Sequence, residues 1–154
     1  TTAIPGPDPS FSTRVHGTQP IIAERAMYWN GGADGGQVCH DSIGLSAPHA
    51  TWYLADGQTS DGRETWTLVQ NPNTSAVTVE ITYMTPSGAG NVVRNETIPA
   101  GSRRSFNMAD HAGISGRAAI MVECTTTGKK VMCERAMYWN DRGAGTDTIG
   151  GYSD

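Results

Sequence analysis

The heptapeptide ERAMYWN stands at Glu24–Asn30 and again, letter for letter, at Glu134–Asn140, 110 positions further along the chain. The match extends into the flanks, because Asp41-Ser-Ile-Gly in the first copy corresponds to Asp147-Thr-Ile-Gly in the second. Aligning the preceding residues carries the correspondence back to Phe11. The chain therefore contains one repeat unit and a second copy of the tail of that unit.

The residues before each heptapeptide predict a β-hairpin. Thr127-Gly128-Lys129 in one copy, and Gly17-Thr18 in the other, are turn-forming residues between apolar segments. We expect hairpins at about residues 11–29 and 119–139. Each is followed by a Gly-rich loop.

Further strands are expected between the two copies. Val77, Val79, Ile81 and Tyr83 alternate with polar residues, which is the period-two pattern of a strand with one buried face. Residues 51–55 also alternate, a further strand is expected at 65–70, and weaker strands are expected at 92–98 and 102–108, with a loop or short helical turn at 109–116. The sequence predicts an all-β fold, an antiparallel immunoglobulin-like β-sandwich with an extra N-terminal hairpin and arm.

The expected organisation has three parts. Residues 1–10 are a Pro-rich extended arm, residues 11–50 form the N-terminal hairpin and Gly-rich loop of the partial repeat, and residues 51–154 form the sandwich unit. The chain begins at Thr1 rather than Met, which fits a processed secreted product or a trimmed chain.

Composition restricts the partners. The 154 residues carry 11 Lys and Arg against 15 Asp and Glu, a net charge of −4, so no basic surface for nucleic acid is expected. No apolar run has the length of a membrane span. Asn73-Thr-Ser and Asn95-Glu-Thr are candidate glycosylation sequons.

The cysteines suggest a cross-link. If Gly128 and Lys129 form a two-residue turn, Cys124 and Cys133 face each other across the hairpin at disulfide distance. A disulfide is expected there, which would indicate an oxidising compartment, and two buried free thiols are the alternative. Cys39 is left over, either as a free thiol or as a link to another subunit.

Candidate chemistry is sparse. His40-Asp41 resembles a catalytic or metal-binding pair, but the second copy has Thr146-Asp147, so the histidine is dispensable to the motif. Neither metal-ligand spacing nor a nucleophile motif is present, and we expect no catalysis, cofactor or metal. Exposed Trp52 or Trp66 would instead suit a glycan-binding surface.

The motifs ERAMYWN, Asp-Ser-Ile-Gly (41–44), TWYLADG (51–57) and LVQNPN (68–73) resemble a family of uncharacterised tandem-repeat β-sandwich domains. These domains occur in secreted and cell-surface proteins of bacteria and some archaea. The resemblance implies an extracellular, non-catalytic, stalk-like or adhesive role and transfers no catalytic residue.

These observations converge on self-assembly. An isolated hairpin is marginal in water, so the partial repeat needs a surface to pack on, either in its own chain or in a neighbouring subunit. We expect strand addition to a neighbour, giving a head-to-tail homopolymer that serves as an extracellular filament or cell-surface assembly. A carbohydrate-binding module or adhesin is the alternative. The expected assembly interface consists of Phe11, Val15, Ile21, Ile22, Met27, Tyr28 and Trp29.

Overall fold

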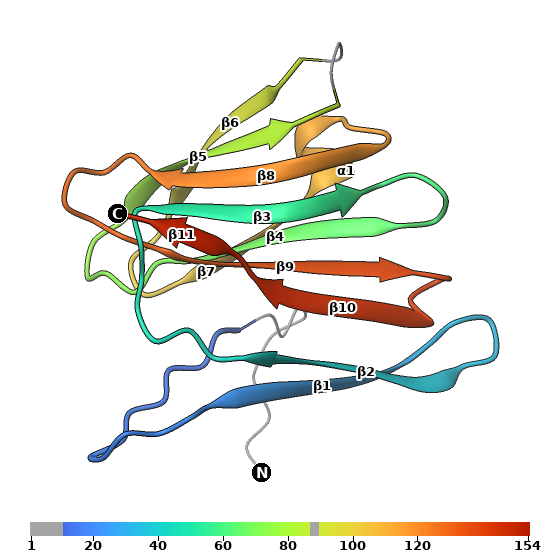
Figure 1. Ribbon diagram of the computed structural model, residues 1–154, viewed down its shortest axis with the longest axis horizontal. Helices are drawn as coiled ribbons and strands as arrows, with labels where there is room; N and C mark the ends of the chain where they lie inside the picture. Colours follow the sequence, from blue (N-terminus) through green and yellow to red (C-terminus); the bar gives the residue numbers. More distant parts are fainter. Residues whose placement is uncertain (1–10, 87–89) are drawn as a thin grey trace.

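Two antiparallel sheets packed face to face make up most of the protein (Figure 1). The structure is a computed structural model and describes residues 11–86 and 90–154. The expected all-β sandwich is confirmed, and β3 begins at Thr51, where the sandwich unit was expected to start. The arm at residues 1–10 lies outside the described residues.

The five-stranded sheet has the order β11–β3–β8–β5–β6 and the four-stranded sheet the order β10–β9–β4–β7. The first contains β3 (Thr51–Gln58), β5 (Val77–Met84), β6 (Val92–Ile98), β8 (Arg117–Cys124) and β11 (Gly151–Ser153). The second contains β4 (Glu64–Gln70), β7 (Arg103–Asn107), β9 (Met132–Trp139) and β10 (Ala144–Ile149).

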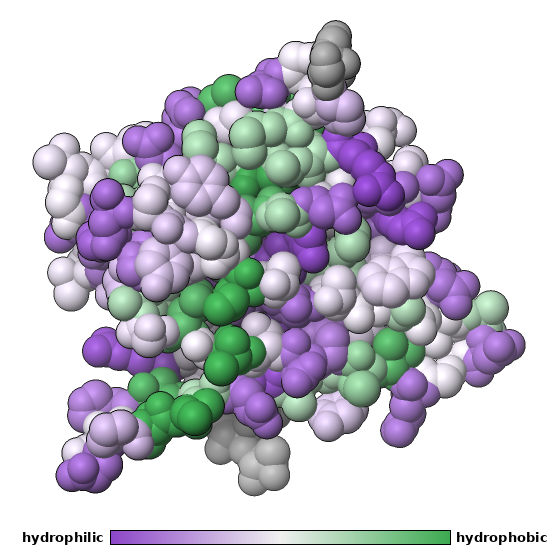
Figure 2. Space-filling view, in the orientation of Figure 1, coloured by the Kyte–Doolittle hydropathy of each residue, from purple (hydrophilic) through white to green (hydrophobic). Residues whose placement is uncertain are grey.

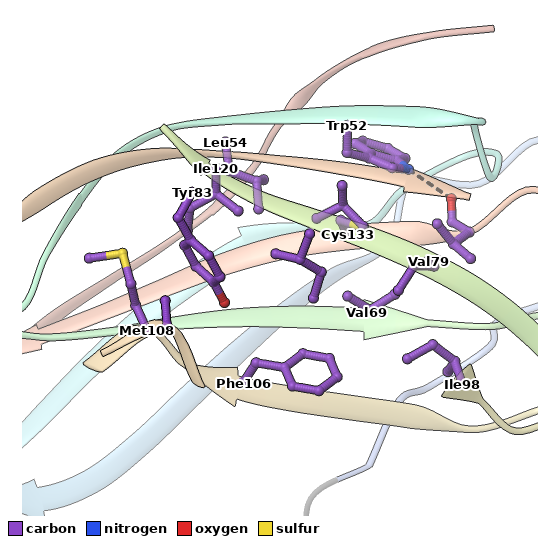
Figure 3. Packing of buried hydrophobic residues seen from close by; sticks show 14 of the residues in the cluster. Trp52, Leu54, Val69, Val79, Tyr83, Ile98, Phe106, Met108, Ile120 and Cys133 are labelled. Atoms are coloured by element: carbon purple, nitrogen blue, oxygen red, sulfur yellow. Dashed lines mark hydrogen bonds between the residues drawn. The ribbon is translucent and has the colours of Figure 1, made fainter. Parts of the chain in front are cut away.

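The core lies between these sheets. Every second residue of β5, from Val77 to Tyr83, is buried there, as the alternation of the sequence predicts. Trp52 lies in the same layer, completely buried, and its indole Nε1 donates a hydrogen bond to the Val131 carbonyl at 2.8 Å (Figure 3). Burial of a tryptophan is tolerated because its one polar atom is satisfied.

One short helix, α1 (Met108–Ala112), covers an end of the sandwich. The side chain of Asn107 accepts a hydrogen bond from the Ala109 N–H at 2.9 Å and so caps the first turn. Gly113, with a φ of 68°, ends the helix in the left-handed conformation that glycine adopts without strain. The short helical turn expected at 109–116 therefore begins one residue earlier.

Both predicted hairpins are wrong. β8 pairs with β3 and β5, whereas β9 pairs with β4 and β10, so the segment around Gly128 crosses from one sheet to the other. In the first copy, residues 11–23 contain no strand, and the hairpin consists of β1 (Glu24–Gly31) and β2 (Gly36–Ile43). Each ERAMYWN motif is thus the first strand of its hairpin rather than the second.

The predicted disulfide is wrong for the same reason. Cys124 and Cys133 do not face each other across a hairpin but belong to opposite sheets, and both are buried free thiols. Burial raises the pKa of both thiols. An oxidising compartment consequently has no support from this pair.

The two copies nevertheless form the same hairpin in the same register. Ala26 is opposite Asp41 in β1–β2, and the corresponding Ala136 is opposite Asp147 in β9–β10. The flanking pairs correspond in the same way along both hairpins. The sequence repeat is therefore a repeat of structure, residue for residue.

The N-terminal hairpin β1–β2 forms a separate two-stranded sheet that lies beside β10 (Figure 1). Because β2 and β10 form no ladder of backbone hydrogen bonds, the hairpin is held against the sandwich by its side chains and by its turn. The surface view shows apolar atoms gathered at the base of this hairpin and along its junction with the sandwich (Figure 2).

Candidate functional site

The contact between the two copies of the repeat is the most specific surface in the described part of the chain. Side chains alternate along a strand, so each hairpin has two faces. We call Arg25, Met27, Trp29 and His40 the docking face of β1–β2. The receiving face on β9–β10 consists of Glu134, Ala136, Tyr138, Gly145 and Asp147.

An ion pair fixes one end of the contact. Arg25 donates from Nη2 to Oδ2 of Asp147 at 2.5 Å, and the same nitrogen lies 3.7 Å from a carboxylate oxygen of Glu134. The side chain of Asp147 is only 1% exposed, while that of Arg25 remains 41% exposed. A charge-assisted hydrogen bond to a carboxylate shielded from water is stronger than an ordinary surface pair.

Aromatic side chains fix the other end. Trp29 donates its Nε1 hydrogen to the carbonyl of Arg142 at 2.7 Å and lies edge-on to the ring of Tyr138, with 5.6 Å between ring centroids. The hydroxyl of Tyr138 lies 3.3 Å from Nε2 of His40. Edge-to-face aromatic pairs of this kind stabilise beyond the area they bury.

Two glycines permit the close approach. A Cβ on Gly31 would lie 2.1 Å from the Arg142 carbonyl oxygen, and a Cβ on Gly145 would lie 2.8 Å from the Tyr138 ring and 3.2 Å from Trp29. In addition, the Gly32 N–H donates to the Asp141 carbonyl at 2.9 Å. The turns of the two hairpins therefore fit each other backbone to backbone.

Burial shifts the ionisable groups at this contact. It lowers the pKa of His40 and raises the pKa of Glu134 and of Tyr138, so each group is driven toward its neutral form. For His40, the nearby charges of Asp147 and Asp41 oppose the effect of burial. Burial therefore favours the neutral ring of His40 in the docked hairpin.

The fold is shared with a protein of known structure. The crystal structure of Thermotoga maritima 1070 superposes on 69% of this chain and 96% of its own length, with a TM-score of 0.59 and 18% identity. The Anabaena sensory rhodopsin transducer covers 58% of this chain and 83% of its own, with a TM-score of 0.46 and 20% identity. No family model and no curated protein matches the chain. At these identities the likeness shows the fold alone.

The structure divides the residues expected at the assembly interface into two groups. Met27 and Trp29 lie on the docking face and are partly buried. The others remain exposed to solvent, with Ile22 the most open at 89% and Tyr28 at 74%. Exposed with them are Phe11, Val15 and Ile21.

His40 and Asp41 do not form a catalytic pair, because neighbouring residues of a strand point to opposite faces. His40 is buried in the contact and Asp41 is exposed. Within residues 11–86 and 90–154, no group of three or more His, Cys, Asp and Glu side chains is placed to hold a metal ion. Cys39 is an exposed free thiol on the same face as Asp41.

Of the two tryptophans expected to suit a glycan-binding surface, Trp52 is completely buried and cannot contact a ligand. Trp66 is partly exposed and donates from Nε1 to Glu64 at 3.1 Å. Of the two sequons, Asn95 is exposed on β6, whereas the Asn73 amide donates to the Asn71 side chain and to the Lys130 carbonyl. Asn95 is thus the more accessible acceptor.

A second polar cluster, which the sequence did not reveal, connects α1 to the sandwich. The hydroxyl of Tyr83 is 2.8 Å from Nδ1 of His111, whose Nε2 is 3.0 Å from Glu96; Glu96 in turn accepts from Arg104 at 2.7 Å. Tyr83 is completely buried, and burial raises its pKa to about 12. With its hydroxyl closed to solvent, the cluster is suited to anchoring the helix rather than to catalysis.

No helix in the described residues is long and apolar enough to cross a membrane.

Proposed function

We propose that this protein is a structural subunit of an extracellular filament or cell-surface assembly, joined head-to-tail through its N-terminal partial repeat. The observation that carries the proposal is the contact of Arg25 and Trp29 with the receiving face of β9–β10. This contact is specific, made largely by side chains, and independent of the strand ladders of the sandwich. Such a contact can form within one chain or between two.

The connection between the hairpin and the sandwich favours exchange between chains. Gly44 is bonded to Ala23 within the hairpin, and His49 is bonded to Val131 of the sandwich, so residues 45–48 are the link between the two anchored parts. A short link between two independently packed parts is a common hinge for exchange of elements between identical chains. Opening it would release the hairpin without breaking a core strand.

Exchange would give an open chain of subunits. The donor surface is β1–β2 and the receiving surface is β9–β10, so one molecule receives a hairpin while offering its own to the next. Two chains that exchanged hairpins reciprocally would close into a dimer, whereas an open filament forms when each chain donates its hairpin to one neighbour and receives one from another. The mode differs from strand addition, because the hairpin packs by its face and leaves the edges of the sandwich unpaired with it.

The extracellular location rests on the resemblance to secreted and cell-surface repeat domains. The free thiols of Cys124 and Cys133 give no support to an extracellular location. The non-catalytic role rests on the same resemblance and on the nature of the contact, which serves attachment. Glycan binding has only Trp66 left to support it.

A charge exchange between chains tests the proposal. We would prepare Arg25→Glu and Asp147→Arg as separate full-length proteins, neither of which can form its own ion pair. In an equal mixture, Arg25 of the second protein can pair with Asp147 of the first, and Glu at position 25 of the first can pair with Arg at position 147 of the second. We expect the mixture to assemble at much lower concentration than either protein alone, as measured by sedimentation velocity and electron microscopy.

Two controls sharpen the result. The double variant Arg25→Glu/Asp147→Arg restores the pair within one chain and should behave as wild type. Arg117→Glu mixed with Glu123→Arg makes the same charge changes at exposed positions of β8 and should not assemble. If the complementary mixture stays monomeric while both proteins are folded, the hairpin does not join subunits and the proposal fails.

A further inference from the structure

The outer face of the N-terminal hairpin reproduces the surface on which that hairpin itself is docked. Its residues are Glu24, Ala26 and Tyr28 on β1, and Cys39 and Asp41 on β2. They correspond in register to Glu134, Ala136, Tyr138, Gly145 and Asp147, the receiving face. Four of the five residues are identical.

These identical residues differ in their surroundings. Ala136 is 3% exposed beneath the docked hairpin, whereas Ala26 is exposed to solvent. The carboxylate of Asp147 is paired with Arg25, whereas none of the hydrogen bonds or ion pairs of the described chain reaches the carboxylate of Asp41. Tyr28 is 74% exposed. The outer face thus has the features of a receiving face that no described residue occupies.

We propose that the outer face of β1–β2 is a second receiving face, and that its occupant is the β1–β2 hairpin of another copy of this chain. The incoming Arg25 would pair with Asp41 and Glu24, as it pairs within one chain with Asp147 and Glu134. The incoming Trp29 would pack edge-on against Tyr28, as it does against Tyr138. Opposite charges and matching aromatic rings therefore select the same docking face.

The occupant must be a hairpin released from its own receiving face, because Arg25 and Trp29 are already engaged when it is docked. Release is the step that the proposed function also requires. The second receiving face, however, does not depend on exchange at Asp147. It would let hairpins stack on one another and extend the assembly sideways from each joint.

Two differences should make binding of a hairpin to the second receiving face weaker than binding to the first. Cys39 replaces Gly145, where any Cβ would lie 2.8 Å from the tyrosine ring and 3.2 Å from the docked Trp29. The strands of β1–β2 also pair two residues further, to Gly31 and Gly36, than those of β9–β10, so the turn does not present a carbonyl at the position where Arg142 accepts the Trp29 hydrogen bond. The thiol of Cys39 consequently stands where the incoming tryptophan must lie, and it limits occupancy.

The test uses the full-length Asp147→Arg protein, whose own receiving face repels Arg25 and so releases the hairpin. We expect this protein to self-associate in sedimentation velocity, and we expect Asp41→Arg in the same background to abolish the association. Cys39→Gly, which restores the residue of the occupied face, should strengthen it about 10-fold, equal to 1.4 kcal/mol. Glu123→Arg, an exposed acidic residue of β8, is the matched control and should change nothing.

A second route to release guards against misfolding of Asp147→Arg. Tyr138→Ala removes the ring that contacts Trp29 and His40, which weakens docking and raises the released fraction of the hairpin, and it leaves the outer face of β1–β2 intact. Hydrogen exchange of β1 and β2 would verify release in either background. If both released proteins stay monomeric, or if they associate equally with and without Asp41→Arg, the second receiving face does not exist.

This outcome is separable from that of the proposed function. Assembly of the mixture of Arg25→Glu and Asp147→Arg beyond that of Asp147→Arg alone depends on position 147, whereas self-association of Asp147→Arg alone depends on position 41. Failure of either experiment leaves the other standing.

Discussion

Hairpins β1–β2 and β9–β10 share the sequence ERAMYWN and the same strand register, yet they occupy different environments. β9 is a central strand of the four-stranded sheet, with the five-stranded sheet on one side and the docked hairpin on the other. Among residues 11–86 and 90–154, β1 has a neighbour on one face only. The same residues therefore contribute to the core in one copy and to an attachment surface in the other.

The arginine of the motif shows the difference most clearly. Arg135 is 8% exposed and donates from Nη1 to the carbonyls of Ala55 and Asp56, where β3 bulges. Arg25 instead reaches a carboxylate at the surface of the sandwich. A motif that closes a core by packing one face can thus use that face to attach to another unit, because the side chains it presents are the same.

Thiol reactivity should separate the two regions by the largest factor. Cys39 is exposed on the outer hairpin, whereas Cys133 and Cys124 are buried in the core and burial raises their pKa. Since a reagent reaches the core thiols only when the protein opens, we expect them to react at least about 10³-fold more slowly than Cys39. A chromogenic disulfide reagent with and without denaturant measures this. Comparable rates, or only one reactive thiol after denaturation, would contradict the structure.

Alanine at the two arginines should give the next largest contrast. Arg135→Ala removes a side chain that is only 8% exposed and leaves the carbonyls of Ala55 and Asp56 without their charged donor, and we expect it to lower the free energy of unfolding by about 3 kcal/mol. Arg25→Ala leaves the carboxylate of Asp147 unpaired, but undocking of the hairpin can return that carboxylate to water, so the loss should be smaller, about 1 to 2 kcal/mol. Urea denaturation of both proteins provides the comparison. Equal losses would mean that the two hairpins are equally integrated into the fold.

The two tyrosines give a smaller contrast of the same kind. Tyr138→Ala removes the edge-to-face contact with Trp29 and should weaken docking of β1–β2 by about 1 kcal/mol. Tyr28→Ala alters only an exposed ring and should leave the monomer unchanged. Hydrogen exchange of the β1 and β2 amides reports docking, with α1 amides as an internal reference. Faster exchange in Tyr28→Ala would show that this ring also holds the hairpin.

The strands were predictable where burial is one-sided. The alternation at residues 77–83 located β5, because a strand with one buried face has period two. The predicted strand at 92–98 coincides with β6, although its apolar residues do not alternate. The predicted hairpin at 119–139 failed because periodicity does not show whether a strand returns to the same sheet or crosses to the facing one. Short connections containing glycine serve both purposes.

The sequence predicted one side of the docking contact but not the other. The repeat identified the module, and Met27 and Trp29 were among the residues expected to make contact. Their partners Asp147 and Arg142 were missed, since long-range pairs depend on how the hairpin is placed against the sandwich. One signal was available: both copies carry an arginine and an aspartate at fixed positions, so complementary charges recur with the motif.

The smallest expected effect is a pH dependence confined to the first hairpin. Burial holds the pKa of His40 below its value of about 6.5 in an unfolded chain, so the docked state favours the neutral ring. The contribution of His40 to the stability of the docked hairpin is therefore complete above pH 6.5. It declines as the pH falls from 6.5 through the lowered pKa of His40 in the docked state. We expect β1–β2 to exchange its amide hydrogens faster, relative to α1, at pH 5 than at pH 7.5, after correction for intrinsic rates.

The second copy supplies the matched variant for this prediction, because it has Thr146 at the position of His40. His40→Thr should remove most of the pH dependence between 5 and 7.5 while leaving the ion pair of Arg25 with Asp147 in place. Glu134 acts in the opposite direction, because burial raises its pKa and so destabilises its ionised form in the docked state. Protonation of Glu134 at low pH removes that destabilisation. If His40→Thr retains the full pH dependence, protonation of another group controls the hairpin and the role assigned to His40 is wrong.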